Sequence, residues 1–202
     1  SHTIKSLSKV PGFYDQLVKG LAEEDRSLLK DLYKDVKKYN KKTKRIKNNV
    51  DETVLHLRED LIDTGTYYVQ SVDYLREIAH CFNYMAFPAF EHIDNNHQGF
   101  DEDQVNELSK LKQGIAKMYN DIIEVIKSKD YQNLDQIIYQ QQELLDQIRD
   151  IRQNQVRRIK ERELHTRASL LFLDILAETK NLLLYSVNLL KSQRDFIGEI
   201  AK

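Results

Sequence analysis

Residues 72–84 read VDYLREIAHCFNY, and residues 173–185 read LDILAETKNLLLY. Each segment carries two acids four positions apart, then an imidazole or amide, then a tyrosine. The first stripe is Asp73, Glu77, His80 and Tyr84, and the second stripe is Asp174, Glu178, Asn181 and Tyr185. Steps of four, three and four residues place side chains on one face of an α-helix. The sequence therefore predicts two helices with polar stripes and suggests a duplicated helical unit.

The remaining chain shows the same helical periodicity, with apolar residues at steps of three or four and no competing strand pattern. Only two prolines and six glycines interrupt it. We expect helices over about 24–60, 62–92, 131–164 and 166–196, and a further one that follows an Asp101 or Asp103 cap and runs to about Val125. Pro88 is expected to kink or end the helix over 62–92. The predicted fold class is all-α, an antiparallel bundle of long helices.

The order of a long helix followed by a striped helix occurs twice, which predicts two pseudo-repeated three-helix units with the first one truncated. The expected units cover about 22–93 and 103–196 within a helical domain of residues 22–196. Residues 1–21 are expected to be a linker or the remnant of a preceding segment, and residues 197–202 a C-terminal tail. Because residue 1 is a serine, we expect a piece of a longer protein, although a processed terminus or an expression scar explains it equally well.

Composition excludes some classes of function. A net charge of −1 gives no general reason to expect nucleic acid as a partner. The single cysteine, Cys81, favours a reducing compartment, and its apolar neighbours predict an inert buried thiol. His56 and His165 are isolated and are expected to be surface residues or lone hydrogen-bonding groups in the core. No Ser-His-Asp or Cys-His pairing and no Gly-rich phosphate loop can be identified, so the sequence predicts a protein that is not an enzyme.

The acids of the stripes lie among apolar residues, where a carboxylate needs a partner, so we expect them to face the bundle interior or a cleft. Two carboxylates and an imidazole suit iron, manganese or zinc. A di-iron bundle needs two Glu-x-x-His steps, and the second stripe has an amide instead. The candidate ligands for a divalent or iron-type metal ion are Asp73, Glu77, His80, Asp174, Glu178 and Asn181. A hydrogen-bond and ion-pair network or a solvated face are the alternatives.

Two further groups of polar residues are candidates. The loop set Glu91, His92, Asp94, Asn95, Asn96 and His97 is expected either to hold a cation or to form local turns at a helix end. A basic run between residues 34 and 47 contains Lys34, Lys37, Lys38, Lys41, Lys42, Lys44, Arg45 and Lys47. It is expected to be a solvated face or, second, a surface that contacts anionic lipid at about 1 kcal/mol per residue.

The striped helices resemble the PhoU-like domains of bacterial phosphate regulation. In that family an acid, three residues and an aspartate place carboxylates where they can hold metal ions; here Asp73 with Glu77 and Asp174 with Glu178 match, with Glu at the second position. The runs YYVQSVDYLREIAHCFNYMAFPAFEHIDNNHQG (67–99) and LDILAETKNLLLYSVNLLKSQRDF (173–196) look like the cytoplasmic C-terminal domain of bacterial inorganic phosphate transporters of the sodium-coupled or Pit type.

The resemblance implies a non-catalytic regulatory or scaffolding domain that controls phosphate uptake from the cytoplasmic side of the inner membrane. Its expected partners are the membrane part of the same transporter, a signalling protein and a second copy in a homodimer, but no nucleic acid. A metal-binding helical-bundle protein and a plain helical oligomerisation module are the alternative functions.

Overall fold

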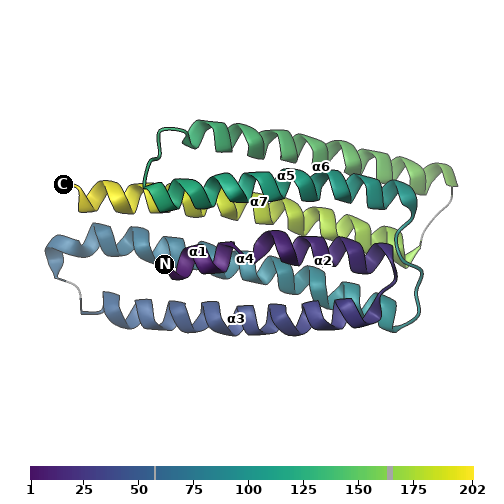
Figure 1. The fold of residues 1–202 in the computed structure, drawn as a ribbon, viewed down its shortest axis with the longest axis horizontal. Helices are drawn as coiled ribbons and strands as arrows, with labels where there is room; N and C mark the ends of the chain where they lie inside the picture. The colour runs from purple at the N-terminus through teal and green to yellow at the C-terminus, as the bar shows by residue number, and fades with distance from the viewer. Residues whose placement is uncertain (57, 163–165) are drawn as a thin grey trace.

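The computed structural model describes residues 1–56, 58–162 and 166–202. The helices are α1 (His2–Leu7), α2 (Val10–Ala22), α3 (Arg26–Val54), α4 (Ile62–Asp94), α5 (Glu102–Ser128), α6 (Leu134–Arg162) and α7 (Arg167–Ile200), with a 3₁₀ turn, η1, at Glu59–Leu61. The described residues contain no strand, and consecutive long helices run in opposite directions (Figure 1). The predicted all-α antiparallel bundle is therefore confirmed.

The two striped helices, α4 and α7, form the most extensive helix pair of the bundle. Helix α3 packs on α4 at one edge, and α6 packs on α5 and α7 at the other (Figure 1). Helices α2 and α5 pack against each other between these edges. A helix, a long helix and a striped helix thus occur in the same order twice, as α2–α3–α4 and α5–α6–α7. Whether the sequence arose by duplication stays a prediction.

The N-terminal segment is not a linker, because α1 and α2 are packed into the bundle. Whether it is the remnant of a preceding segment stays a prediction. The side chains of α1 and α2 contribute to the same core as the long helices, through Leu7, Val10, Phe13, Tyr14, Leu17, Val18 and Leu21. Pro11 lies in the first turn of α2, where a missing N–H breaks no helical hydrogen bond. The Pro11-Gly12 pair therefore begins a helix.

Helix boundaries agree with the periodicity in most places. Asp101 caps α5, and the side chain of Gln104 completes a capping box with it. Pro88 lies inside α4, which continues to Asp94, so the helix does not end at the proline. Residues 197–200, expected in the tail, belong to α7. For the helix expected over 131–164, the predicted end lies outside the described residues. His165 lies outside them as well.

Three buried tyrosine hydroxyls join helices across the core. Tyr14 of α2 hydrogen-bonds Thr179 of α7 at 2.9 Å. Tyr119 of α5 hydrogen-bonds Ser186, which also lies in α7. Tyr39 of α3 donates to the carbonyl oxygen of residue 6 in α1 at 3.1 Å. A buried hydroxyl without a partner raises the free energy of the folded state. These bonds therefore favour one register of helix packing over the neighbouring registers.

Gly99, in the loop between α4 and α5, lies against the end of α2. A Cβ atom at this position would be 2.4 Å from the carbonyl oxygen of Leu21. That oxygen also accepts a hydrogen bond from the backbone N–H of Phe100, so it cannot move away freely. We expect Gly99→Ala to lower the free energy of unfolding by about 2 kcal/mol, measured by urea denaturation.

Gly12→Ala is the matched control, because Gly12 lies in α2 and a Cβ there would have no atom within 4 Å. Alanine restricts the unfolded chain and suits a helix, so this variant should gain about 0.5 kcal/mol. Changes of the same sign in the two variants would contradict the close approach at Gly99.

Candidate functional site

The two stripes meet where α4 packs against α7. The Cys81 thiol of α4 lies close enough to Glu178 of α7 for the carboxylate to influence its pKa. Burial raises the pKa of Cys81, and the negative charges of Glu178 and Glu77 raise it further. The pKa of Tyr185 is raised by burial and then by the charges of Glu77 and Glu178. We call Glu77, Cys81, Glu178 and Tyr185 the acid seam.

Asp73 of the first stripe pairs with Lys47 of α3, with 2.8 Å between the Lys47 Nζ and the carboxylate. The close ion pair with Asp73 raises the pKa of Lys47. Both side chains are nearly half exposed, at 41% and 45%. The first acid of this stripe is thus neutralised at the surface between α3 and α4.

Arg76, which the sequence analysis missed, links the first stripe to α3. Its guanidinium donates to the carbonyl oxygen of Asn40 at 2.8 Å and to the Thr43 hydroxyl at 2.9 Å. It also lies 2.9 Å from His80 Nε2, and because arginine can only donate, that nitrogen accepts. Nδ1 of the ring lies 3.7 Å from Glu77. The first stripe is therefore part of a network of hydrogen bonds and ion pairs between α3 and α4.

One polar residue on the buried face of α3 could have predicted this network from the sequence. Thr43 lies seven residues after Val36 and seven before Val50, on the buried face of α3. A polar residue at such a position needs a partner, which here is Arg76. The sequence does not show which of the many charged residues supplies it.

Asp174 of the second stripe is exposed and lies apart from the acid seam. It lines a cleft of about 280 Å³ together with Glu91, His92 and His97. The structure thus brings the beginning of α7 to the loop set at the end of α4. Asn181 is half-buried on the same helix.

Polar groups of the loop set contact one another, Gln98 and Arg26 of α3. His92 is buried, and its Nε2 lies 2.6 Å from the carbonyl oxygen of Gln98, to which it donates. The rings of His92 and His97 are 5.2 Å apart. Asp94 forms an ion pair with Arg26 of α3, and Asn96 has a positive φ of 60°. These contacts are typical of local turns at a helix end.

Metal binding by the stripe residues is not supported by their arrangement. In residues 1–56, 58–162 and 166–202, no group of three or more His, Cys, Asp or Glu side chains could hold a metal ion. Lys47 forms an ion pair with Asp73, and Arg76 donates a hydrogen bond to Nε2 of His80. Both positive groups would repel a metal ion at these positions. Binding of a divalent or iron-type ion by the candidate ligands stays a prediction.

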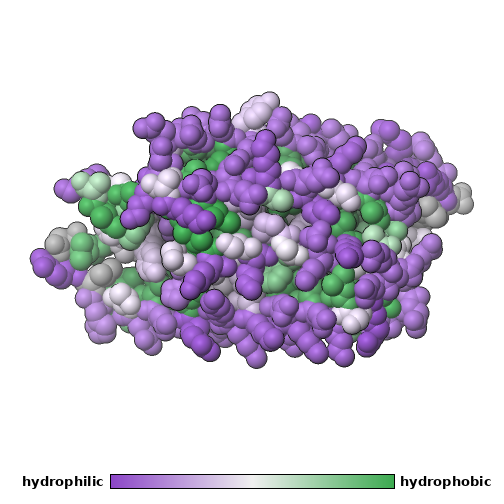
Figure 2. Space-filling model, viewed as in Figure 1, coloured by the Kyte–Doolittle hydropathy of each residue, from purple (hydrophilic) through white to green (hydrophobic). Residues whose placement is uncertain are grey.

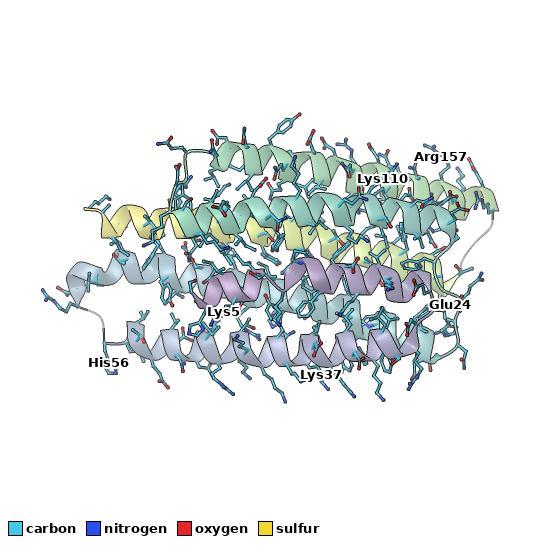
Figure 3. The ribbon with its side chains drawn as sticks, in the orientation of Figure 1. Lys5, Glu24, Lys37, His56, Lys110 and Arg157 are labelled. Atoms are coloured by element: carbon cyan, nitrogen blue, oxygen red, sulfur yellow. The ribbon has the colours of Figure 1, made fainter. Side chains whose placement is uncertain are left out.

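The basic run lies on the outer edge of α3. Seven of its eight residues are exposed, and Lys47 is the half-exposed partner of Asp73. Figure 3 shows Lys37 pointing away from the bundle, and His56 is exposed beyond the end of the same helix. Figure 2 shows this edge as a hydrophilic margin, while patches of hydrophobic surface appear along the middle of the same face.

Comparisons with known proteins add no assignment. No model of a known protein family matches the chain, and no curated protein matches it either. Among the helices of the described ranges, none is both long enough and apolar enough to cross a bilayer.

Proposed function

We propose that this chain is a non-catalytic regulatory or scaffolding domain of a phosphate transporter, on the cytoplasmic side of the inner membrane. The observation that carries the proposal is the meeting of the two stripes at the acid seam, between α4 and α7. A pair of striped helices at the centre of a helical bundle fits the resemblance to PhoU-like domains. Its partners are the membrane part of the same transporter, a signalling protein and a second copy of the chain.

The contacts of the polar groups support a structural rather than a catalytic role. Asp73 pairs with Lys47, His80 accepts from Arg76, and Cys81 lies beside the charge of Glu178. A raised pKa keeps the Cys81 thiol protonated and therefore a poor nucleophile. Groups that satisfy one another in this way fix the packing of helices.

The basic run supports a position beside the membrane. Seven of its eight side chains are exposed, and Lys37 points away from the bundle (Figure 3). Each lysine or arginine close to anionic head groups contributes about 1 kcal/mol of attraction. A domain held beneath a transporter would meet such a surface with α3.

Phosphate uptake tests the proposal in cells that carry the natural gene. Deletion of residues 22–196 should leave a membrane part that inserts but takes up phosphate without the normal response to phosphate supply. Glu77→Gln with Glu178→Gln should weaken that response, because it removes both charges of the acid seam. Glu143→Gln, at an exposed position of α6, is the control.

Normal uptake and normal response after the deletion would contradict a regulatory role. A gene without any membrane segment beside this domain would remove the transporter assignment.

A helical oligomerisation module is the second candidate, favoured by apolar residues at one end of the bundle. Leu55 is 82% exposed, Ile62 55% and Ile200 60%. Such a patch is typical of a surface that contacts another protein. Sedimentation equilibrium of the chain would give a dimer or higher oligomer in this case.

A further inference from the structure

A lysine-rich cavity lies where the junction of α1 and α2 meets α3, away from the acid seam. It has a volume of about 250 Å³. Lys5 and Lys9 approach it from the N-terminal segment, and Lys38 and Lys42 from α3. Lys38 and Lys42 are four residues apart and lie on one face of α3, whereas Lys9 lies in the turn between α1 and α2. Figure 3 shows Lys5 on the side of α1 that is toward α3.

The charge of the lining strongly favours an anion. Asp35 is the one acid among the described lining residues, so four lysines leave an excess of three positive charges. Asp35 lies 3.8 Å from Lys38, and their side chains are 53% and 80% exposed, so this pair is weak. A hollow lined by charges of one sign concentrates the opposite ion more strongly than a flat surface does.

A buried hydroxyl in the lining adds a second, independent observation. Ser6 is only 2% exposed, and its Oγ has no hydrogen-bond partner in the part of the chain that the structure describes. An unpaired buried hydroxyl is uncommon in folded proteins and needs an explanation. The Tyr39 hydroxyl donates to the carbonyl oxygen of Ser6 and holds this residue against α3. Ser6 therefore keeps an unused hydroxyl donor at the wall of the cavity that the lysines line.

The size of the cavity limits the ligand. At about 250 Å³ it is smaller than the pockets of about 300–1,000 Å³ that hold drug-sized molecules. Lysine ammonium groups bind phosphate oxygens as point charges, without the flat geometry that arginine imposes. We propose that this cavity binds a small phosphate-type anion with several negative charges, such as pyrophosphate. The proposal goes beyond the transporter assignment and does not depend on it.

Calorimetric titration of the full 202-residue chain with sodium pyrophosphate at low salt tests the site. Lys38→Gln with Lys42→Gln should weaken binding about tenfold, because it removes two of the four attractive charges. Asp35→Asn should strengthen binding roughly threefold, because the one repulsive charge is lost. These positions are exposed, so the variants should keep the thermal stability of the parent.

Lys41→Gln with Lys44→Gln is the matched control. It removes the same charge from exposed positions of the same helix, and neither lysine is among the described lining residues. Binding in this control should stay within about twofold of the parent, since more distant exposed charges are screened. Equal losses in the two double variants, or no binding of pyrophosphate or vesicles by the parent, would overturn the proposal.

The phosphate group could belong to a lipid instead of a free anion, and vesicles distinguish the two. Phosphatidylcholine vesicles that contain phosphatidic acid are mixed with the same variants, and bound protein is measured by co-sedimentation. Vesicle binding without pyrophosphate binding, lost only in Lys38→Gln with Lys42→Gln, would identify a lipid head group as the ligand of the cavity. Vesicle binding that is lost equally in both double variants, without pyrophosphate binding, would assign the attraction to the whole edge of α3 and refute the cavity.

Discussion

Arg158→Met should lower the free energy of unfolding by about 3 kcal/mol, because it leaves a carboxylate buried without its partner. Arg158 of α6 pairs with Glu107 of α5, and the two side chains are only 15% and 16% exposed. The same guanidinium donates to Gln155, which also accepts from the capping residue Gln104. The pair therefore joins α5 to α6 near the beginning of α5. Urea denaturation of the variant measures the loss.

Two further variants separate the pair from its surroundings. Glu107→Leu added to Arg158→Met should recover much of the loss, because no unpaired charge remains. Arg149→Met removes a pair with Asp146 whose side chains are 64% and 60% exposed, and should cost less than about 1 kcal/mol. A loss at Arg158 no larger than the loss at Arg149 would show that the pair is not effectively buried.

Alkaline pH should destabilise the protein steeply. Burial raises the pKa of Tyr14, Tyr39 and Tyr119 well above their ordinary value of about 10. Above pH 10 the unfolded chain releases these protons while the folded chain keeps them. The stability that these three groups contribute is therefore complete below pH 10 and falls as the pH rises. Three such groups give a slope approaching about 4 kcal/mol per pH unit. Urea denaturation between pH 9 and 11.5 measures it.

Single phenylalanine variants test the source of that slope. Tyr119→Phe removes one of the three buried phenols and should reduce the slope by about 1.4 kcal/mol per pH unit. Tyr139→Phe removes a phenol that is 65% exposed on α6 and should leave the slope unchanged. An absorbance titration near 295 nm should show the buried tyrosines ionising only as the protein unfolds. Gradual ionisation of all eleven tyrosines in the folded state would contradict their burial.

The sequence by itself determined the long helices. Apolar spacing depends only on the 3.6-residue period of the helix, so it predicted α3 to α7 with their ends within a few residues in most cases. The Asp101 cap is local chemistry and was also predictable. The helical segment at residues 2–22 was missed, because Pro11-Gly12 was interpreted as a break although proline suits the first turn of a helix.

Tertiary structure alone decided which polar groups became partners. The stripes were visible as helix faces, but the pairing of Asp73 with Lys47 and the position of Cys81 beside Glu178 were not. Tyr14 and Thr179, which share a hydrogen bond, are 165 residues apart in the chain. Periodicity fixes the direction of a side chain from its own helix, whereas a contact depends on the rotation and offset of two helices. Those follow from the packing of the whole core.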